Sequence, residues 1–316
     1  MPIIFTQPAG PTIGWEAVTT TGNPFTPTQF YNAKMWLYPD NNTLLVAARS
    51  TSSSPSREVA SLNLTTMAWS ALQNPLPHNG KLGHAVWHPV SGNPLIMGVS
   101  DQSRSVYEYI IGTDTWTKTQ PFLPPRTFQG AAATNLPNGD VILLGPNQPA
   151  LQYNDAVSWD GTTLTVLADI PTSPVAVSGN SNLFASGTKV YMIGNRLVAG
   201  AVATDVVYRY DTNLNSWDSS ITMPEPHQQC VVVPLDSTRA MVIGGSTGGG
   251  GSSNEKTYIF DASTETFTPY GVDYAEPAAS SSASITSSQG IKLDDGRVLM
   301  LHSGTVVEGY VTINPV

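Results

Sequence analysis

Three carboxylates are the side chains of this 316-residue chain best placed for acid–base chemistry: Glu225, Asp273 and Glu276. They lie in long connecting segments, as do three basic groups, Lys81, Arg126 and His227. A carboxylate beside a base can move protons to and from a bound substrate. A paired acid–base site is therefore available if the fold brings these segments together.

The histidines and the single cysteine form no metal-binding pattern. The five histidines are scattered: His78, His84, His88, His227 and His302. His84 and His88 are the nearest pair, but four residues along a strand separate them by about 13 Å, too far to share a metal. We expect His84 to line a central channel, with Gln129 and Cys230 at matching positions. Cys230 precedes three valines, which favours a buried apolar thiol. No metal or other cofactor is predicted.

Composition restricts the partners. Charged residues are 12% of the chain, hydrophobic residues are 40%, and the net charge is −9. Nucleic acids and anionic membranes need clustered Lys and Arg, and no such cluster exists. The first ten residues lack the basic and apolar regions of a signal peptide. No apolar run approaches the ~18 residues of a membrane span, so we expect neither export by a signal peptide nor membrane insertion.

The elements that position these residues are repeated. Six short apolar strands end at positions separated by about 50 residues, near Ala47, Gly98, Gly145, Gly194, Gly244 and His302. A second signature follows in four of the six units, where two large apolar residues enclose a six-residue turn: Leu62 and Trp69, Tyr109 and Trp116, Tyr210 and Trp217, Phe260 and Phe267. A β-rich repeat of this length is typical of propeller blades.

These features resemble the kelch repeat family across nearly the whole chain. The family's glycine doublet is present as Gly244-Gly245, and its Tyr–Trp pair is complete in two units. The resemblance implies an all-β fold, a six-bladed kelch-like β-propeller in one domain spanning residues 1–316. The sixth unit lacks a last strand. We expect residues 13–18, around Trp15, to complete it and so to close the ring with the N-terminal strand.

The two faces of such a disc are predicted to differ. The turns between first and second strands are short and rich in Asp, Asn and Gly. The opposite face carries longer loops, among them residues 50–58, 146–154, 195–205 and 246–255, and crossovers such as 221–228. We predict that this long-loop face binds a partner. The contact candidates combine stacking with hydrogen bonding: His78, Phe122, Arg126, Gln148, Arg196, His227, Tyr270 and Tyr274.

Low charge, abundant Ser, Thr, Asn and Pro, and almost no cysteine resemble the virion proteins of bacteriophages. We therefore expect a non-catalytic binding or structural propeller on a virion surface, as part of a tail, fibre or capsid decoration. Its partner would be a host surface glycan or another virion protein. A cytoplasmic kelch interaction adaptor and a sugar-modifying kelch enzyme of the sialate mutarotase type are the alternatives. Kelch copper radical oxidases need a Cys–Tyr crosslink and two histidine ligands, and no residues here can be matched to that set.

Overall fold

The fold was analysed in a computed structural model of the chain. The structure describes residues 17–18, 20–25, 33–49, 57–71, 73–75, 84–97, 106–119, 132–144, 156–170, 175–176, 183–194, 196–197, 202–227, 230–247, 255–271, 289–294, 296–301 and 308–312. Strands and turns account for these ranges, and they contain no helix of the length and apolarity needed to cross a membrane.

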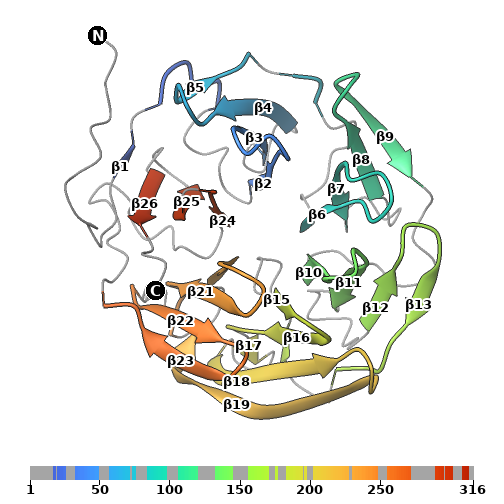
Figure 1. Cartoon of the computed structure of the whole chain (residues 1–316), viewed down its shortest axis with the longest axis vertical. Helices are drawn as coiled ribbons and strands as arrows, with labels where there is room; N and C mark the ends of the chain where they lie inside the picture. The colour runs from blue at the N-terminus through green and yellow to red at the C-terminus, as the bar shows by residue number, and fades with distance from the viewer. Residues whose placement is uncertain are drawn as a thin grey trace.

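The strands form antiparallel sheets arranged around a common centre, which makes the chain an all-β propeller (Figure 1). We number the sheets as blades 1 to 6. Blade 1 contains β2 (Lys34–Leu37), β3 (Thr43–Arg49), β4 (Arg57–Asn63) and β5 (Ala68–Trp69). Blade 2 contains β6 (His84–Trp87), β7 (Pro94–Met97), β8 (Val106–Ile110) and β9 (Thr115–Thr119). Blade 3 contains β10 (Ala132–Asn135), β11 (Val141–Leu144), β12 (Ala156–Trp159) and β13 (Leu164–Val166).

The remaining blades follow in chain order. Blade 4 contains β15 (Leu183–Ser186), β16 (Lys189–Met192), β18 (Val202–Asp211) and β19 (Ser216–His227), extended by β14 (Val175–Ala176) and β17 (Arg196–Leu197). Blade 5 contains β20 (Val231–Pro234), β21 (Arg239–Ile243), β22 (Thr257–Asp261) and β23 (Thr266–Pro269). The sixth sheet, described in part, contains β24 (Gln289–Lys292), β25 (Arg297–Leu301), β26 (Glu308–Thr312) and the N-terminal β1 (Ala17–Val18).

The core lies between the blades. One cluster of buried apolar side chains occupies each of the six junctions between neighbouring sheets. The junction of the sixth sheet with the first is among them, with Leu293 and Leu299 packed against Met35 and Leu44. The six inner strands also contact one another in sequence, and β24 contacts β2. Each blade therefore buries both of its faces, which explains the nearly continuous apolar second strands.

The aromatic pairs lie where the sequence places them. Tyr109 pairs with Trp116 and Tyr210 with Trp217 across the outer hairpins of their blades, with ring centroids 5.0 and 5.1 Å apart. The Trp217 Nε1–H donates to the carbonyl of Ala168 in the preceding crossover, at 2.8 Å. The pair therefore fastens blade 4 to the chain that leaves blade 3.

Blade 4 is larger than expected. Residues 195–205, predicted to be a loose loop, include β17 and the start of β18. Residues 221–228, predicted to be a crossover, mostly continue β19 as far as His227. β17 and β18 pair with each other, Arg196 with Ala203 and Leu197 with Val202, and β14 and β19, which lie elsewhere in the chain, extend this pairing. The mostly small side chains of 195–205 carry no strand pattern of their own.

The N-terminal strand joins the last sheet, as predicted. Ala17 pairs with Gly309, and Val18 pairs with Glu308. The chain then reaches blade 1, where Thr21 exchanges backbone hydrogen bonds with Met67 and Trp69, each 3.0 Å. Residues 13–16, including Trp15, lie outside the described ranges.

Candidate functional site

The candidate site lies at the long-loop end of the junction between blades 4 and 5. Here β19 ends, β22 begins, and the Gly244-Gly245 doublet follows β21. The Tyr258 hydroxyl donates to Glu225 Oε1 at 2.7 Å. His227 Nδ1 lies 2.8 Å from the carbonyl oxygen of Gly244, and its ring meets the Tyr258 ring edge-on at 5.8 Å. Glu225, His227 and Tyr258, three proton-carrying groups from two blades, therefore form one connected arrangement.

The environment of His227 determines its protonation. The side chain is fully buried, and this burial lowers its pKa, although the Gly244 hydrogen bond and the Glu225 charge oppose the shift. The imidazole is therefore neutral at neutral pH. Because a carbonyl oxygen only accepts hydrogen bonds, Nδ1 carries the hydrogen that binds Gly244. Held in this way, His227 fixes the end of β19 against blade 5.

The glycine doublet has a conformational role at this point. Gly244 and Gly245 both have positive φ, 59° and 111°. A side chain at either position would be strained in this backbone conformation. The doublet thus lets the chain turn sharply out of β21, where the Gly244 carbonyl binds His227.

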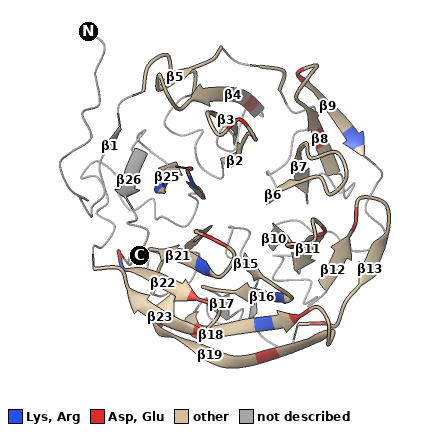
Figure 2. Cartoon of the chain, viewed as in Figure 1, with Lys and Arg blue, Asp and Glu red and all other residues tan. Residues whose placement is uncertain are grey.

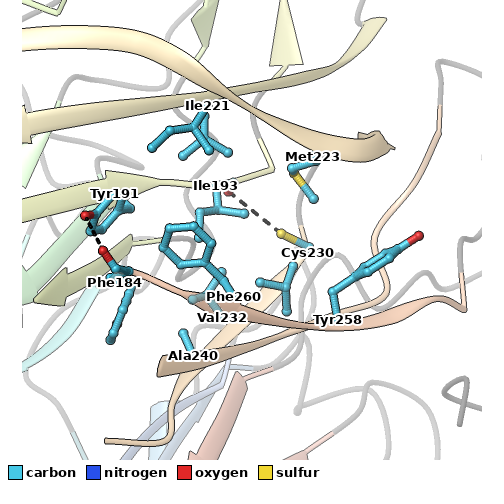
Figure 3. Packing of buried hydrophobic residues seen from close by; sticks show 13 residues of the cluster. Phe184, Tyr191, Ile193, Ile221, Met223, Cys230, Val232, Ala240, Tyr258 and Phe260 are labelled. Carbon is cyan, nitrogen blue, oxygen red and sulfur yellow. Dashed lines mark hydrogen bonds between the residues drawn. The ribbon is translucent and has the colours of Figure 1, made fainter. Parts of the chain in front are cut away.

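A cavity of about 360 Å³ lies next to Tyr258. Its walls come from β22, β23 and their flanks: Lys256, Thr257, Tyr258, Pro269 and Gly271. Thr257 is 2% exposed, and within the described part of the chain no group bonds its Oγ1. In Figure 3 the Tyr258 hydroxyl points away from the apolar cluster of this junction, while Cys230 lies within that cluster. The cavity offers polar groups on a rigid β-scaffold, which suits a small polar ligand.

A second hollow lies at the periphery, between β19 and β23. It measures about 470 Å³ and is lined by Ser220, Ile221, Thr222, Met223, Pro224, Glu265, Thr266 and Phe267. Its carboxylate is already paired, because Glu265 accepts from Arg209 at 2.5 and 2.6 Å and from Lys189 at 3.1 Å. Arg209 also binds Asp218. These bonds lower the pKa of Glu265 against the opposing effect of its partial burial, and they join blades 4 and 5.

The predicted contact residues are only partly placed. His227 belongs to the Glu225–Tyr258–His227 arrangement, but it is fully buried and therefore has a supporting role in the site. Tyr270 follows β23, its N–H donates to the Thr257 carbonyl at 2.9 Å, and its ring packs against the core of blades 5 and 6, where burial raises its pKa. Arg196 lies on β17, where it pairs with Ala203 of β18. Five candidates lie outside the described residues: His78, Phe122, Arg126, Gln148 and Tyr274.

Tyr258 is the member of the site that sequence reasoning missed. It occupies a strand position, and 33 residues separate it from Glu225, so neither pattern nor spacing connects the two. The available signal was the family doublet Gly244-Gly245, because that doublet marks the blade end where the three groups meet.

Cys230 has a structural position. It is fully buried, as its apolar neighbours predicted, and burial raises its pKa to about 12. It packs between blades 4 and 5, with Sγ 3.8 Å from the Ile193 carbonyl, rather than lining the channel beside His84 as expected (Figure 3). The offset differs because Cys230 precedes its inner strand, whereas His84 begins one. Within the described ranges, no three His, Cys, Asp or Glu residues cluster in a way that could hold a metal.

Comparison with known proteins identifies the fold and leaves the activity open. No family model matches the chain, and no curated protein sequence matches it. Among solved structures, the structure of YjhT is 13% identical with a TM-score of 0.65, covering 91% of this chain and 95% of that one. A fungal alcohol oxidase of the AA5 family, in complex with copper, is 12% identical with a TM-score of 0.63, covering 95% of this chain and 76% of that one. At these identities the likeness establishes a kelch-like β-propeller fold and nothing further.

Proposed function

We propose that this chain is a six-bladed kelch-like binding propeller, closed by its N-terminal strand, that takes a polar ligand on its long-loop face. The observation that carries the proposal is the Glu225–Tyr258–His227 arrangement beside the 360 Å³ cavity. Glu225 offers carboxylate oxygens as acceptors, and Lys256, which lines the cavity, carries an ammonium that can donate. Donors and acceptors of both kinds suit a hydroxyl-rich ligand such as a surface glycan.

We base the proposed setting, the surface of a virion, on the composition of the chain. A chain of low charge and few cysteines suits a virion-surface component that contacts a host glycan or another virion protein. The few charges of the described blades are scattered over several of them, as Figure 2 shows. A scattered charge pattern favours recognition by hydrogen bonds and stacking over recognition by a charged patch. A cytoplasmic interaction adaptor would use the same face for a protein partner.

A sugar-modifying activity is the second candidate. Glu225, Tyr258 and His227 could exchange protons with a bound sugar, because each can hold a proton and all three are in contact. This candidate predicts turnover, whereas the binding proposal predicts none.

The test measures binding of the purified, labelled chain to arrayed glycans and to fixed bacterial cells. Any glycan that gives a signal is then titrated by calorimetry against three variants. Glu225→Gln keeps an acceptor for Tyr258 but removes the charge, and Tyr258→Phe removes the hydroxyl while keeping the ring. Leu214→Ser is the matched control, because Leu214 is 72% exposed in the outer turn at the opposite end of the same blade.

We expect selective binding that Glu225→Gln and Tyr258→Phe each weaken at least fivefold and that Leu214→Ser leaves unchanged. Melting curves of all variants verify that the fold is intact. Absence of selective binding to glycans and cells, or binding that neither site variant affects, would reject the proposed site. Conversion of a bound sugar that is lost in Glu225→Gln would favour the enzyme instead.

A further inference from the structure

Lys34 is a lysine in an unusual place. It is the first residue of β2, the inner strand of blade 1, and β2 contacts the inner strands of both neighbouring blades, β6 and β24. The crossovers of the long-loop face lead into the first strand of each blade, and these six strands form what we call the inner ring. As the first residue of β2, Lys34 therefore lies at the long-loop end of the inner ring. Its side chain is 1% exposed. Lysine is almost never buried to this extent unless its ammonium is paired.

The direction of the Lys34 side chain follows from strand alternation. Ala33 and Met35 belong to the cluster facing the sixth sheet, whereas Trp36 belongs to the cluster facing blade 2. Lys34 therefore points toward blade 2. Its cross-strand neighbour on this face is small, because Ala47 pairs with Lys34 across the sheet.

No counter-charge accompanies the ammonium in the described part of the chain. Burial is the cause that lowers the Lys34 pKa to about 8, without a contribution from any hydrogen bond or charged neighbour. On the inner strands that β2 contacts in the neighbouring blades, the charged and titratable residues are His84 on β6 and Lys292 on β24. Lys292 lies at the other end of the ring, where its Nζ donates to the Leu235 carbonyl at 2.5 Å.

The described inner strands have the opposite charge bias from the sequence as a whole. Asp and Glu outnumber Lys and Arg by 23 to 14 in the sequence. Yet the six described inner strands contain no Asp or Glu, and their titratable side chains are Lys34, His84 and Lys292. A buried cation without a counter-charge is costly unless an anion joins it.

We propose that Lys34 is the counter-charge for a small oxyanion, the carboxylate or phosphate group of a ligand, bound at the long-loop end of the inner ring between blades 1 and 2. This site is separate from the candidate site between blades 4 and 5. An experiment can therefore reject either proposal without rejecting the other. Anion binding supplies a counter-charge to the ammonium and favours the protonated amine. Binding therefore takes up protons above pH 8 and weakens about tenfold between pH 7 and pH 9.

The test observes the amine directly. The chain contains six lysines, so protein labelled with ¹³C at the lysine ε-carbon gives six signals, and Lys34→Met assigns the signal of Lys34. The wild-type protein is titrated with pH alone, then in saturating acetate, and separately in saturating inorganic phosphate. Lys118 is the matched control, because it lies on the outer strand β9 and is exposed.

We expect the Lys34 signal to titrate near pH 8 without anion and at least one pH unit higher with the anion that binds, while Lys118 does not respond. A response to acetate alone identifies a carboxylate ligand, and a response to phosphate alone identifies a phosphate ligand. Calorimetry should show saturable binding that Lys34→Met abolishes and Lys118→Met retains. A Lys34 midpoint unmoved by both anions overturns the proposal, and because this measurement uses the wild-type protein, it decides the matter even if Lys34→Met fails to fold.

Discussion

At the scale of single residues, the burial of Lys34 makes the stability of the protein depend on pH. The unfolded chain keeps the Lys34 proton up to its ordinary pKa of 10.5, whereas the folded chain loses it at about 8. Between these two pKa values the unfolded state binds more protons than the folded state. The contribution of Lys34 to the free energy of unfolding therefore rises with pH across this range. Below pH 8 both states are protonated, and the folded state bears the full cost of burying the charge.

Lys34→Met should therefore stabilise the protein in the absence of ligand. Methionine keeps an unbranched stem and removes the charge, so we expect the free energy of unfolding at pH 7 to rise by about 2–3 kcal/mol. The gain should shrink as the pH approaches 10. Urea unfolding at pH 7, 8.5 and 10 measures it, with Lys118→Met as the exposed control. A loss of stability at pH 7 would show that Lys34 is paired within the fold.

At the scale of elements, the outer hairpins depend on the residue that ends each turn. Met67, Asp114, Asn215 and Glu265 occupy this same position in four blades, and all have positive φ. In blade 4 the Asn215 Oδ1 accepts both the Tyr210 hydroxyl and the Ala168 N–H, each at 2.7 Å. In blade 2 the Tyr109 hydroxyl donates to Asp114 in the same way. One side chain thus fixes the turn, the tyrosine and the preceding crossover.

Asn215→Ala should cost about 2–3 kcal/mol of unfolding free energy, because it removes two hydrogen bonds and places alanine at a φ of 47°. Asn215→Asp should retain most of the stability, since blade 2 uses Asp at this position. Asn213→Ala, in the same exposed turn, serves as the control. Chemical unfolding compares the three variants. Equal effects of the two alanine substitutions would mean that the tyrosine bond contributes little.

These hairpins also show what the sequence could and could not reveal. Tyr210 and Trp217 were predictable as partners because their spacing reflects a turn of fixed length, a local property of the chain. Strand β17 and the early start of β18 were not, because they pair with each other and also with β14 and β19, and the latter two lie elsewhere in the chain. The same limit applies to the sites. Glu225 and His227 stood out by residue type, whereas the Tyr258 hydrogen bond and the burial of Lys34 are properties of the assembled blades.

At the scale of the whole molecule, the N-terminal segment connects the last sheet to the first. Its strand β1 pairs with β26 in the sixth sheet. A few residues later, Thr21 bridges to Ala68 in blade 1, and Phe25 packs edge-on against Trp69 with ring centroids 5.4 Å apart. The segment therefore holds together two sheets that come from opposite ends of the chain. Without it, the outer edge of β26 would lack this partner.

Deletion of residues 1–19 should leave the propeller folded but open at this junction. The lost ladder and the weakened packing of Phe25 should lower the melting temperature by about 5–10 °C. The unpaired edge of β26 should also promote self-association, which sedimentation velocity detects. Deletion of residues 1–10 is the control, because it keeps Ala17 and Val18, which pair with β26, and it should change neither property. A synthetic peptide covering residues 11–22 should restore the melting temperature of the longer deletion in a concentration-dependent way, because it can supply β1 as a separate chain. If the longer deletion melted and sedimented like the intact protein, the six inner-strand junctions alone would hold the ring closed, and the N-terminal strand would be dispensable for closure.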